Sequence, residues 1–404
     1  MSICRCLFII WLLAAAALGS SQTIGVYSEL EGPKLTAVSA LVADPSDGRI
    51  LWDRKGTEVR EPASTTKMIT ALLFIEKVPL TEMVEAPLEV AQVTGSRIGL
   101  RPGDKVPAEQ ILQAILVRSA NDACVAAAVK ASGSVEAFVQ DMNSKAKELG
   151  CKDTVFKNPH GLHQEGHVST AHDLALIALA AIKTPDFRAA VALPKVAVSF
   201  NGKPPIEFDS RNELIGEDAT NLGIKTGWTD QAGRCFVGWH RKDGVEFVSV
   251  ILGCPSKWQP DQIALRDWVF TSFEKKQLVK KGEVMGRRKV AWALGGAVPL
   301  VAVDSLTALV PKGIKAASLR DVPGLSAPMT VGVKAGRAEW QGGLSVGLIA
   351  AEGRMAWWQP AVTILLLLGG GVFLIWRRNN LLRARLRAQR QRELEEIRRR
   401  SGRL

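Results

Sequence analysis

A run of 20 residues without a charged side chain, from Trp357 to Trp376, restricts the fold of this 404-residue chain more than any other feature. A helix rises about 1.5 Å per residue, so this run is roughly 30 Å long and matches the hydrocarbon core of a bilayer. Tryptophans stand at both ends, as at membrane interfaces, and Pro360 lies in the first turn, where proline is tolerated. Two arginines follow at once. The sequence predicts a transmembrane helix over 357–376 rather than a buried core helix. The positive-inside rule places the tail 377–404 in the cytoplasm and the body of the chain outside.

The N-terminal segment predicts export. Residues 7–18, which follow Arg5, are all apolar, and Gly19, Ser20 and Ser21 are small. This pattern indicates a secretory signal peptide over residues 1–21. An uncleaved anchor is the alternative, but an apolar run of about 12 residues is short for a membrane span. Both apolar segments therefore place the body of the chain outside the cytoplasm.

The net charge of +12 does not indicate a nucleic-acid partner. The tail 377–404 alone holds eleven arginines and three glutamates, which leaves the rest of the chain only slightly basic. No basic and aromatic residues alternate as they do in single-strand binders. A basic helix near anionic lipid and a solvated disordered segment are both compatible with the tail.

The remaining segments predict an α+β domain over 28–275 and an all-β domain over 278–353. The first contains a strand hairpin, a block of helices, three consecutive strands and a closing helix, which is typical of helices beside one antiparallel sheet. The second has short β-type runs with Gly and Pro turns. The expected strands are 36–54 (the hairpin), 222–229, 233–242 and 245–253, and the expected helices are 64–75, 107–131, 134–149, 170–183 and 260–273.

Four cysteines remain after removal of the signal peptide, and none forms a C-x-x-C pair. A structural zinc site is therefore not expected. Cys235 and Cys254 flank a hairpin whose turn is Asp243-Gly244, and this turn would put Cys235 opposite Leu252 with Cys254 diagonal to it. A disulfide between these two and buried free thiols are both compatible with the spacing. The four are Cys124, Cys151, Cys235 and Cys254.

Ser64-Thr65-Thr66-Lys67 is the first of three short motifs with catalytic chemistry. Residues three apart share a face of a helix, so Ser64 and Lys67 would meet one turn apart. A serine hydroxyl becomes a good nucleophile only when a base takes its proton. A lysine that is buried beside another cation loses its charge more readily and can be that base. Alone, an S-x-x-K motif is weak evidence, because it arises by chance in most long chains.

Ser119-Ala120-Asn121 is the second motif and lies in an apolar stretch. Its polar side chains need partners if they are buried, and a solvent-facing turn between two helices is the alternative interpretation.

Lys225-Thr226-Gly227, the third motif, lies on a predicted strand, where Lys225 and Gly227 face one way and Thr226 the other. Gly227 lets a ligand approach the strand edge closely. The N–H of Trp228 and the N–H of Ser64 could form an oxyanion hole, in which each donor is typically worth a few kcal/mol.

The order S-x-x-K, S-x-N, K-T-G, with spacings of 55 and 106 residues, is far more specific than any one motif. This trio is the signature of penicillin-binding proteins and class A β-lactamases. The chain resembles the D-alanyl-D-alanine carboxypeptidase family of low-molecular-mass penicillin-binding proteins, well over 28–275 and more weakly over 278–352. The resemblance rests on Pro62-Ala63-Ser64-Thr65-Thr66-Lys67-Met68-Ile69-Thr70-Ala71, Arg118-Ser119-Ala120-Asn121-Asp122-Ala123-Cys124, Asn158-Pro159-His160-Gly161-Leu162, Gly166-His167, Ser169-Thr170-Ala171 and Gly223-Ile224-Lys225-Thr226-Gly227-Trp228-Thr229.

The resemblance implies a penicillin-binding transpeptidase/β-lactamase-like fold and a serine enzyme that uses no metal or cofactor. Such an enzyme removes the terminal D-alanine from peptidoglycan pentapeptides, is acylated by β-lactam antibiotics and works outside the bacterial inner membrane. It implies catalytic roles for Ser64 as nucleophile, Lys67 as base and Ser119 in proton relay. The substrate-binding residues that it implies are Asn121, Lys225, Thr226, Gly227 and Trp228.

The sequence departs from the family at the carboxylate site and leaves related activities open. Family members often have an arginine just beyond the strands after K-T-G, whereas this chain has Lys257 there, which offers a point charge instead of a fork. A class A β-lactamase is disfavoured because the only E-x-x-x-N segment after the second motif, 217–221, ends four residues before Lys225. A D,D-endopeptidase and an extracytoplasmic penicillin sensor remain alternatives. The histidines at 160, 163, 167 and 172 match no metal-binding spacing.

Overall fold

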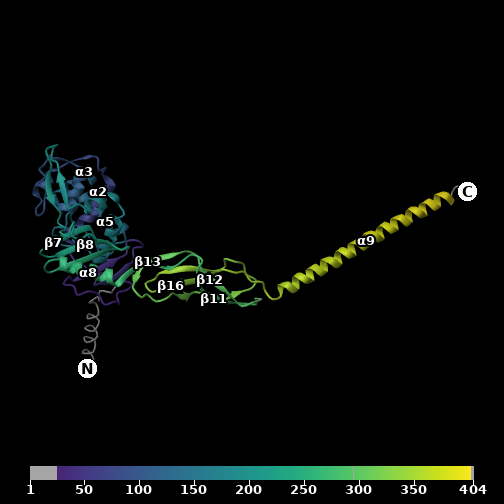
Figure 1. Cartoon of the computed structure of the whole chain (residues 1–404). Coiled ribbons are helices and arrows are strands. Elements are labelled where there is room, and N and C mark those ends of the chain that lie inside the picture. The colour runs from purple at the N-terminus through teal and green to yellow at the C-terminus, as the bar shows by residue number, and fades with distance from the viewer. Residues whose placement is uncertain (1–24, 294, 402–404) are drawn as a thin grey trace, which may run out of the picture. The chain divides into compact units, whose positions relative to one another are not determined.

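The computed structural model describes residues 25–293 and 295–401 (Figure 1). The signal peptide expected at 1–21 lies outside the described residues. The chain packs into two compact units. The first comprises the chain up to Lys276 together with Thr307–Lys315 and Gln341–Gly343, and the second comprises Gln277–Leu306, Ala316–Trp340 and the residues from Leu344 onward.

A five-stranded antiparallel sheet forms the centre of the first unit. Its strand order is β2-β1-β9-β8-β7, so β7 is an edge strand. The expected hairpin and the three consecutive strands are confirmed, and the turn at Asp243-Gly244 pairs Lys242 with Val245. The strands are β1 (Ser39–Ala43), β2 (Ile50–Arg54), β7 (Asn221–Thr229), β8 (Gly233–Lys242) and β9 (Val245–Cys254).

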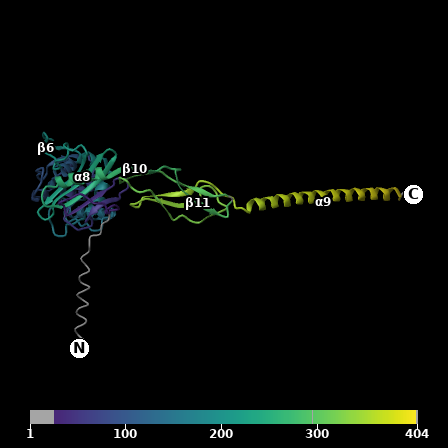
Figure 2. The same ribbon diagram turned by 60° about the horizontal axis from the view of Figure 1, so that its bottom comes forward.

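Helices cover both faces of this sheet. Successive side chains of a strand point to opposite faces, so one strand contributes side chains to two cores. On β9, Val250 and Leu252 pack into a core with the helical block, while Phe247 and Ile251 pack into a second core with α8 (Gln259–Ser272). The helix α8, labelled in Figure 2, packs against β8 and β9. The helical block consists of α2 (Lys67–Lys77), α3 (Ala108–Gln113), α4 (Asn121–Ser132), α5 (Val135–Glu148), α6 (Ala171–Ala181) and α7 (Pro185–Val191).

Two helix predictions were wrong in detail. The helix expected over 107–131 is interrupted: α3 passes into a π-helical turn, η3 (Ala114–Arg118), and Ser119 then adopts a left-handed backbone with φ 63°. The helix expected from Ser64 instead begins as a 3-10 turn, η1 (Ala63–Thr66), before α2 starts at Lys67. The described elements that were not expected are β3 (Met83–Glu85), η2 (Leu88–Gln92), β4 (Lys105–Pro107), α7, β5 (Lys195–Val198) and β6 (Ile206–Asp209).

The second unit is rich in strands, as expected. Its six-stranded sheet has the order β14-β16-β17-β12-β11-β15. Two strands outside this sheet, β10 (Phe273–Val279) and β13 (Leu306–Pro311), form a separate ladder, and β13 from Thr307 onward belongs to the first unit. The strands of the large sheet are β11 (Val284–Ala291), β12 (Ala297–Ala302), β14 (Ser318–Arg320), β15 (Leu325–Ser326), β16 (Lys334–Glu339) and β17 (Ser345–Ala350).

The C-terminal segment forms one long helix, α9 (Gln359–Ser401), drawn in yellow in Figure 1. Among the described residues, it is the one helix long and apolar enough to cross a membrane. The basic tail is helical as far as Ser401, and its expected position near anionic lipid stays a prediction.

The four cysteines of the described chain are free thiols. The β8–β9 ladder keeps the expected register as far as Phe236, which pairs with Ile251, and an irregularity then shifts it. Cys254 therefore lies opposite Arg234 instead of diagonal to Cys235. Burial raises the pKa of the Cys235 thiol to about 11, which keeps it protonated at neutral pH.

Candidate active site

Ser64 and Lys67 meet where η1 passes into α2. The Lys67 Nζ lies 2.9 Å from the Ser64 Oγ, at hydrogen-bonding distance. The lysine is fully buried, whereas the serine is partly exposed, so a ligand can reach the hydroxyl while the amine stays dry. The 3-10 turn brings residues three apart into register on one face, which places the two side chains side by side.

The loop that follows α5 holds Lys67 from the other side. The Lys67 Nζ donates to the backbone oxygen of His160 at 2.5 Å, and Thr70 donates its hydroxyl to the backbone oxygen of Pro159. Gly161 has φ +83°, and a Cβ there would lie 1.9 Å from the Ala63 oxygen. Only glycine therefore permits this close approach of the loop to the helix start.

Burial lowers the pKa of Lys67 from 10.5 to about 8, while the Coulombic effects of Cys124 and Asp122 partly oppose the shift. Removing an ammonium from water disfavours its charged form. The neighbouring cation is Lys225, whose pKa is lowered by burial and then by the charge of Lys67. A lysine with a pKa near 8 has enough neutral form at physiological pH to accept a proton.

Two histidines of the same loop, the partly buried His160 and the buried His167, stay neutral. Burial lowers the pKa of His160 to about 3 and that of His167 to about 4. The His167 ring bonds the Thr66 hydroxyl at 2.9 Å and accepts from the Lys157 N–H at 3.0 Å. His167 therefore supports the turn that carries the Ser64–Lys67 pair.

The S-x-N motif is buried, so the solvent-facing interpretation was wrong. Ser119 is 6% exposed and Asn121 is 3% exposed. The Asn121 amide donates to the Thr94 oxygen at 2.7 Å, and its backbone N–H donates to the Ser96 oxygen at 2.7 Å. The preceding turn, η3, packs against both α2 and β7. The S-x-N motif therefore begins directly after a turn that contacts elements of both other motifs.

The edge strand β7 places the K-T-G motif against the start of the helix. A Cβ on Gly227 would lie 3.1 Å from the Ser64 nitrogen and 3.2 Å from the Pro62 oxygen, so the glycine allows strand and turn to touch. Lys225 is buried and donates to the Thr226 oxygen at 3.0 Å. Thr226 is partly exposed at the free edge of the sheet. The structure therefore brings the first and third motifs into direct contact.

Trp228, the residue after the motif, is 55% exposed. It pairs across the ladder with Arg234, whose guanidinium carbon lies 5.6 Å from the centroid of the indole ring. A cation over an aromatic face is attracted by the ring. Arg234 is itself exposed, so this pair marks the accessible end of β7.

Two residues that no motif identified lie at the same site. Arg211 donates to the Ser96 hydroxyl at 3.5 Å, and its charge lowers the pKa of Lys225. Ser96 in turn accepts from the Asn121 N–H and donates to the Arg118 oxygen. Both residues lie in segments without a catalytic pattern, so sequence analysis had no signal for them.

Lys257 is exposed between β9 and α8, and its proposed contact with a substrate carboxylate stays a prediction. Arg266 bonds Asp218 at 2.5 Å and Asp267 at 2.7 Å, so two carboxylates already engage this guanidinium. Asn221 is the first residue of β7, which puts the 217–221 segment directly at the strand.

The other two histidines of the histidine-rich stretch pair with separate carboxylates. His163 contacts Glu61 at 2.9 Å, and His172 contacts Asp173 at 3.2 Å. No group of three or more potential metal ligands occurs within the described ranges 25–293 and 295–401.

Residues 27–256 match the sequence model of the D-alanyl-D-alanine carboxypeptidase family, and they contain every motif of the site. The chain belongs to the D-alanyl-D-alanine carboxypeptidase family. It is 32% identical to the D-alanyl-D-alanine carboxypeptidase DacF of Bacillus subtilis over 284 residues, which cover 69% of this chain and 73% of that protein. It is 33% identical to a D-alanyl-D-alanine endopeptidase of Pseudomonas aeruginosa over 244 residues, which cover 59% and 78% of the two chains.

Solved structures agree with this membership. Penicillin-binding protein 5 from Haemophilus influenzae is similar with a TM-score of 0.63 and 27% identity, over 81% of this chain and 99% of that one. The protein is therefore a serine-type peptidase of the cell-wall carboxypeptidase family, with the expected α+β catalytic fold.

Proposed function

We propose that this family member removes the terminal D-alanine from peptidoglycan pentapeptides through an acyl-enzyme intermediate on Ser64. The observation that carries the proposal is the 2.9 Å contact between the Ser64 hydroxyl and the buried Lys67 amine. A nucleophile beside a base of matched pKa is the arrangement that acyl transfer needs.

In the proposed acylation step, neutral Lys67 takes the proton from the Ser64 hydroxyl as the Oγ attacks the carbonyl carbon of the penultimate D-alanine. The carbonyl carbon becomes tetrahedral, and its oxygen becomes negative. The N–H groups of Ser64 and Trp228 then donate to that oxygen. The contact of Gly227 with the Ser64 nitrogen supports this role, because it brings β7 directly beside the N–H of the nucleophile.

Collapse of this intermediate breaks the peptide bond and releases D-alanine, whose nitrogen receives a proton. We assign the relay of that proton to Ser119, which directly follows the turn η3, and η3 contacts both α2 and β7. Water then attacks the Ser64 ester, with Lys67 again the nearest base. The enzyme returns to its starting state with the shortened peptide released.

The substrate would lie along the free edge of β7. Asn121 is the candidate contact for a peptide amide, while Lys225 and Thr226 are candidates for the terminal carboxylate. Arg211 strengthens this assignment, since its charge acts on Lys225 and adds to the positive potential there. Penicillins carry a carboxylate beside a strained amide, so the same residues would bind them before Ser64 is acylated.

The proposed location is the outer face of the inner membrane, with one span over 357–376. The length and hydropathy of α9 support this span, and the tail 377–404 would then lie in the cytoplasm. The predicted signal peptide at 1–21 gives the same orientation.

A D,D-endopeptidase acting on cross-links is the second candidate, because the Pseudomonas aeruginosa relative carries that name. The chemistry is the same, and only the substrate differs. A carboxypeptidase must bind a free terminal carboxylate, whereas an endopeptidase need not.

Mass spectrometry of the purified full-length protein tests the proposal. We expect a free-acid D-Ala-D-Ala peptide to lose one alanine, and penicillin to add its mass to the peptide that contains Ser64. Cleavage of a cross-linked dimer with no release of alanine from the pentapeptide would show an endopeptidase. A stable penicillin adduct without turnover of either peptide would show a sensor.

A further inference from the structure

The end of the β-rich unit where α9 begins exposes an unusual set of apolar side chains. We call this the anchor-proximal surface and define it by Trp292, Val331, Met355 and Trp357. Their exposed fractions are 68%, 65%, 55% and 58%. Large apolar side chains that gather on one surface indicate an interaction site.

Backbone contacts hold the three segments of this surface together. The Trp357 N–H donates to the Trp292 oxygen at 2.9 Å, and Ala293 pairs with Ala356 in an isolated bridge. On the other side, Met329 and Arg354 exchange two hydrogen bonds of 2.9 Å. The loop that contains Val331 and the turn that contains Trp292 are therefore fixed to the chain that leads into α9.

This surface lies immediately beside the first residue of the helix. The Ala356 N–H donates to the Gln359 side chain at 2.7 Å, and the Gln359 N–H donates to the Ala356 oxygen at 3.0 Å. Gln359 is the first residue of α9. If α9 crosses the bilayer, as the proposed function holds, Ala356 and the residues paired with it lie at the membrane surface.

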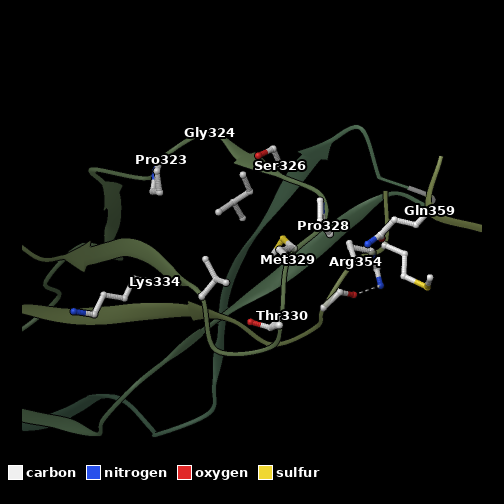
Figure 3. Close-up of a pocket in the computed structure, with 13 residues that line it drawn as sticks. Pro323, Gly324, Ser326, Pro328, Met329, Thr330, Lys334, Arg354 and Gln359 are labelled. Atoms are coloured by element: carbon white, nitrogen blue, oxygen red, sulfur yellow. Dashed lines mark hydrogen bonds between the residues drawn. The ribbon is translucent and has the colours of Figure 1, made fainter. Parts of the chain in front are cut away.

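An open groove of about 870 Å³ adjoins the surface. Figure 3 shows Arg354 and Gln359 at one end of this groove and Lys334 at the other, with Met329 between them. Arg354 bonds Glu352 at 2.6 Å, so much of its charge is balanced. The groove has a mixed lining, in which Leu325, Met329, Val333 and Met355 are apolar.

The backbone of Trp292 adds a second indication. Its φ is +61°, a left-handed conformation that is costly for a bulky residue. Such strain persists only where the surrounding structure enforces it, and it often marks functional positions. The residue in this conformation carries an indole that is 68% exposed.

We propose that the anchor-proximal surface lies in the lipid headgroup region of the bilayer, so that the β-rich unit contacts the membrane in addition to being tethered to it. This inference rests on the proposed transmembrane span. Lipid is the favoured partner because the proposed span begins at Trp357, within this surface, and because tryptophan is enriched at the membrane interface. A second protein bound at this surface is the competing outcome of the test.

Quenching of tryptophan fluorescence by brominated lipid tests the proposal. The full-length protein is reconstituted in phosphatidylcholine vesicles with and without bromine near the top of the acyl chain. Wild type is compared with Trp292→Phe, which keeps an aromatic residue at the strained position. Trp340→Phe is the matched control, because Trp340 lies in the same unit but is 5% exposed.

In wild type, we expect brominated lipid to quench the fluorescence of Trp292. Trp292→Phe lacks this tryptophan, so the drop in emission intensity caused by bromine should be smaller than in wild type. In Trp340→Phe, the drop in emission intensity caused by bromine should equal that of wild type. Equal quenching in wild type and Trp292→Phe would show Trp292 in water or against a protein and would overturn the proposal.

Two further variants separate this failure from a failure of the anchor. Trp357→Phe and Trp376→Phe report the ends of the span. If these two lower the quenching but Trp292→Phe does not, the span stands and the membrane contact of the β-rich unit is wrong. If none of the three lowers it, the proposed span fails and the inference fails with it.

Discussion

Replacing Lys67 with arginine tests whether this residue is the catalytic base. The substitution keeps a positive charge and a hydrogen-bond donor at the same position. A guanidinium does not lose its proton in the range where the enzyme works, so it cannot accept the proton of Ser64. We expect the variant to fold and to lose acylation.

The pKa of Lys67 sets the size of the effect. At about pH 7.4, a lysine with a pKa of about 8 is neutral in roughly one molecule in five, and one at 10.5 in roughly one in a thousand. Burial therefore raises the concentration of the active form by roughly two orders of magnitude. General base catalysis itself is worth roughly 10²–10⁴-fold, so Lys67→Arg should slow acylation by at least about 100-fold.

The same pKa predicts how acylation depends on pH. The neutral amine is the active form, and it accumulates as the pH rises through about 8. Below that value the acylation rate should rise about tenfold per pH unit, and above it the rate should level off.

The assay is the rate of labelling by a fluorescent penicillin in the first turnover, measured from about pH 6 to pH 10. Lys77→Arg is the matched control, since Lys77 lies at the other end of α2 and bonds Asp141 at the surface. Circular dichroism checks that both variants fold. Labelling of Lys67→Arg near the wild-type rate, or a pH profile that is flat through 8, would refute the assignment.

Other substitutions test separate parts of the proposal. Ser64→Ala should abolish both peptide turnover and penicillin labelling, and labelling that survives would point to another nucleophile. Deleting 359–404 should release a soluble, active protein from membranes, because every motif ends by Gly227; a folded but inactive truncate would contradict this. Lys257→Ala should lower kcat/KM for the free-acid peptide by about 10–100-fold, as for a charged hydrogen bond of roughly 1.5–3 kcal/mol, and should affect the amidated peptide much less. Equal small effects on both peptides would leave the carboxylate to Lys225, Thr226 or Arg211. Near neutral pH, the free energy of unfolding measured with urea should be higher for Lys67→Met than for wild type, by on the order of 3 kcal/mol. This difference in the free energy of unfolding should narrow towards pH 10.

Most of the catalytic fold could be predicted from sequence because its signals are local. The turn at Asp243-Gly244 fixed the register of β8 and β9, and Ser134 caps α5 by accepting from the Ala137 N–H. The K-T-G motif lies on a strand, and its alternation agrees with the burial of Lys225 and the partial exposure of Thr226. These features depend on neighbours in the chain, so the sequence alone carries them.

The remaining features depend on contacts between distant segments. No helix breaker follows Pro107 in the stretch 107–131, yet η3 and the left-handed Ser119 interrupt it. The partner of Lys67 opposite Ser64 is a backbone oxygen of His160, and a backbone group has no sequence signature. Arg211 reaches the site from outside every motif. The three motifs predicted which residues lie together in the site. They did not predict the burial that lowers the pKa of Lys67 and lets it act as a base.

The two buried lysines connect the stability of this site with its chemistry. Burying an ammonium costs several kcal/mol unless it is paired, and the site buries Lys67 and Lys225 close enough for each charge to act on the other. Between about pH 8 and 10.5 the unfolded chain binds a proton at Lys67 that the folded chain has released, so this residue costs less stability as the pH rises. Below about pH 8, Lys67 is protonated in both the folded and the unfolded chain, and the burial of its charge lowers the stability of the fold by the full amount. The close approaches at Gly161 and Gly227 pack the loop and β7 against the turn that precedes Lys67, which is fully buried. The destabilisation of the charged amine is therefore the same physical effect that makes Lys67 a base.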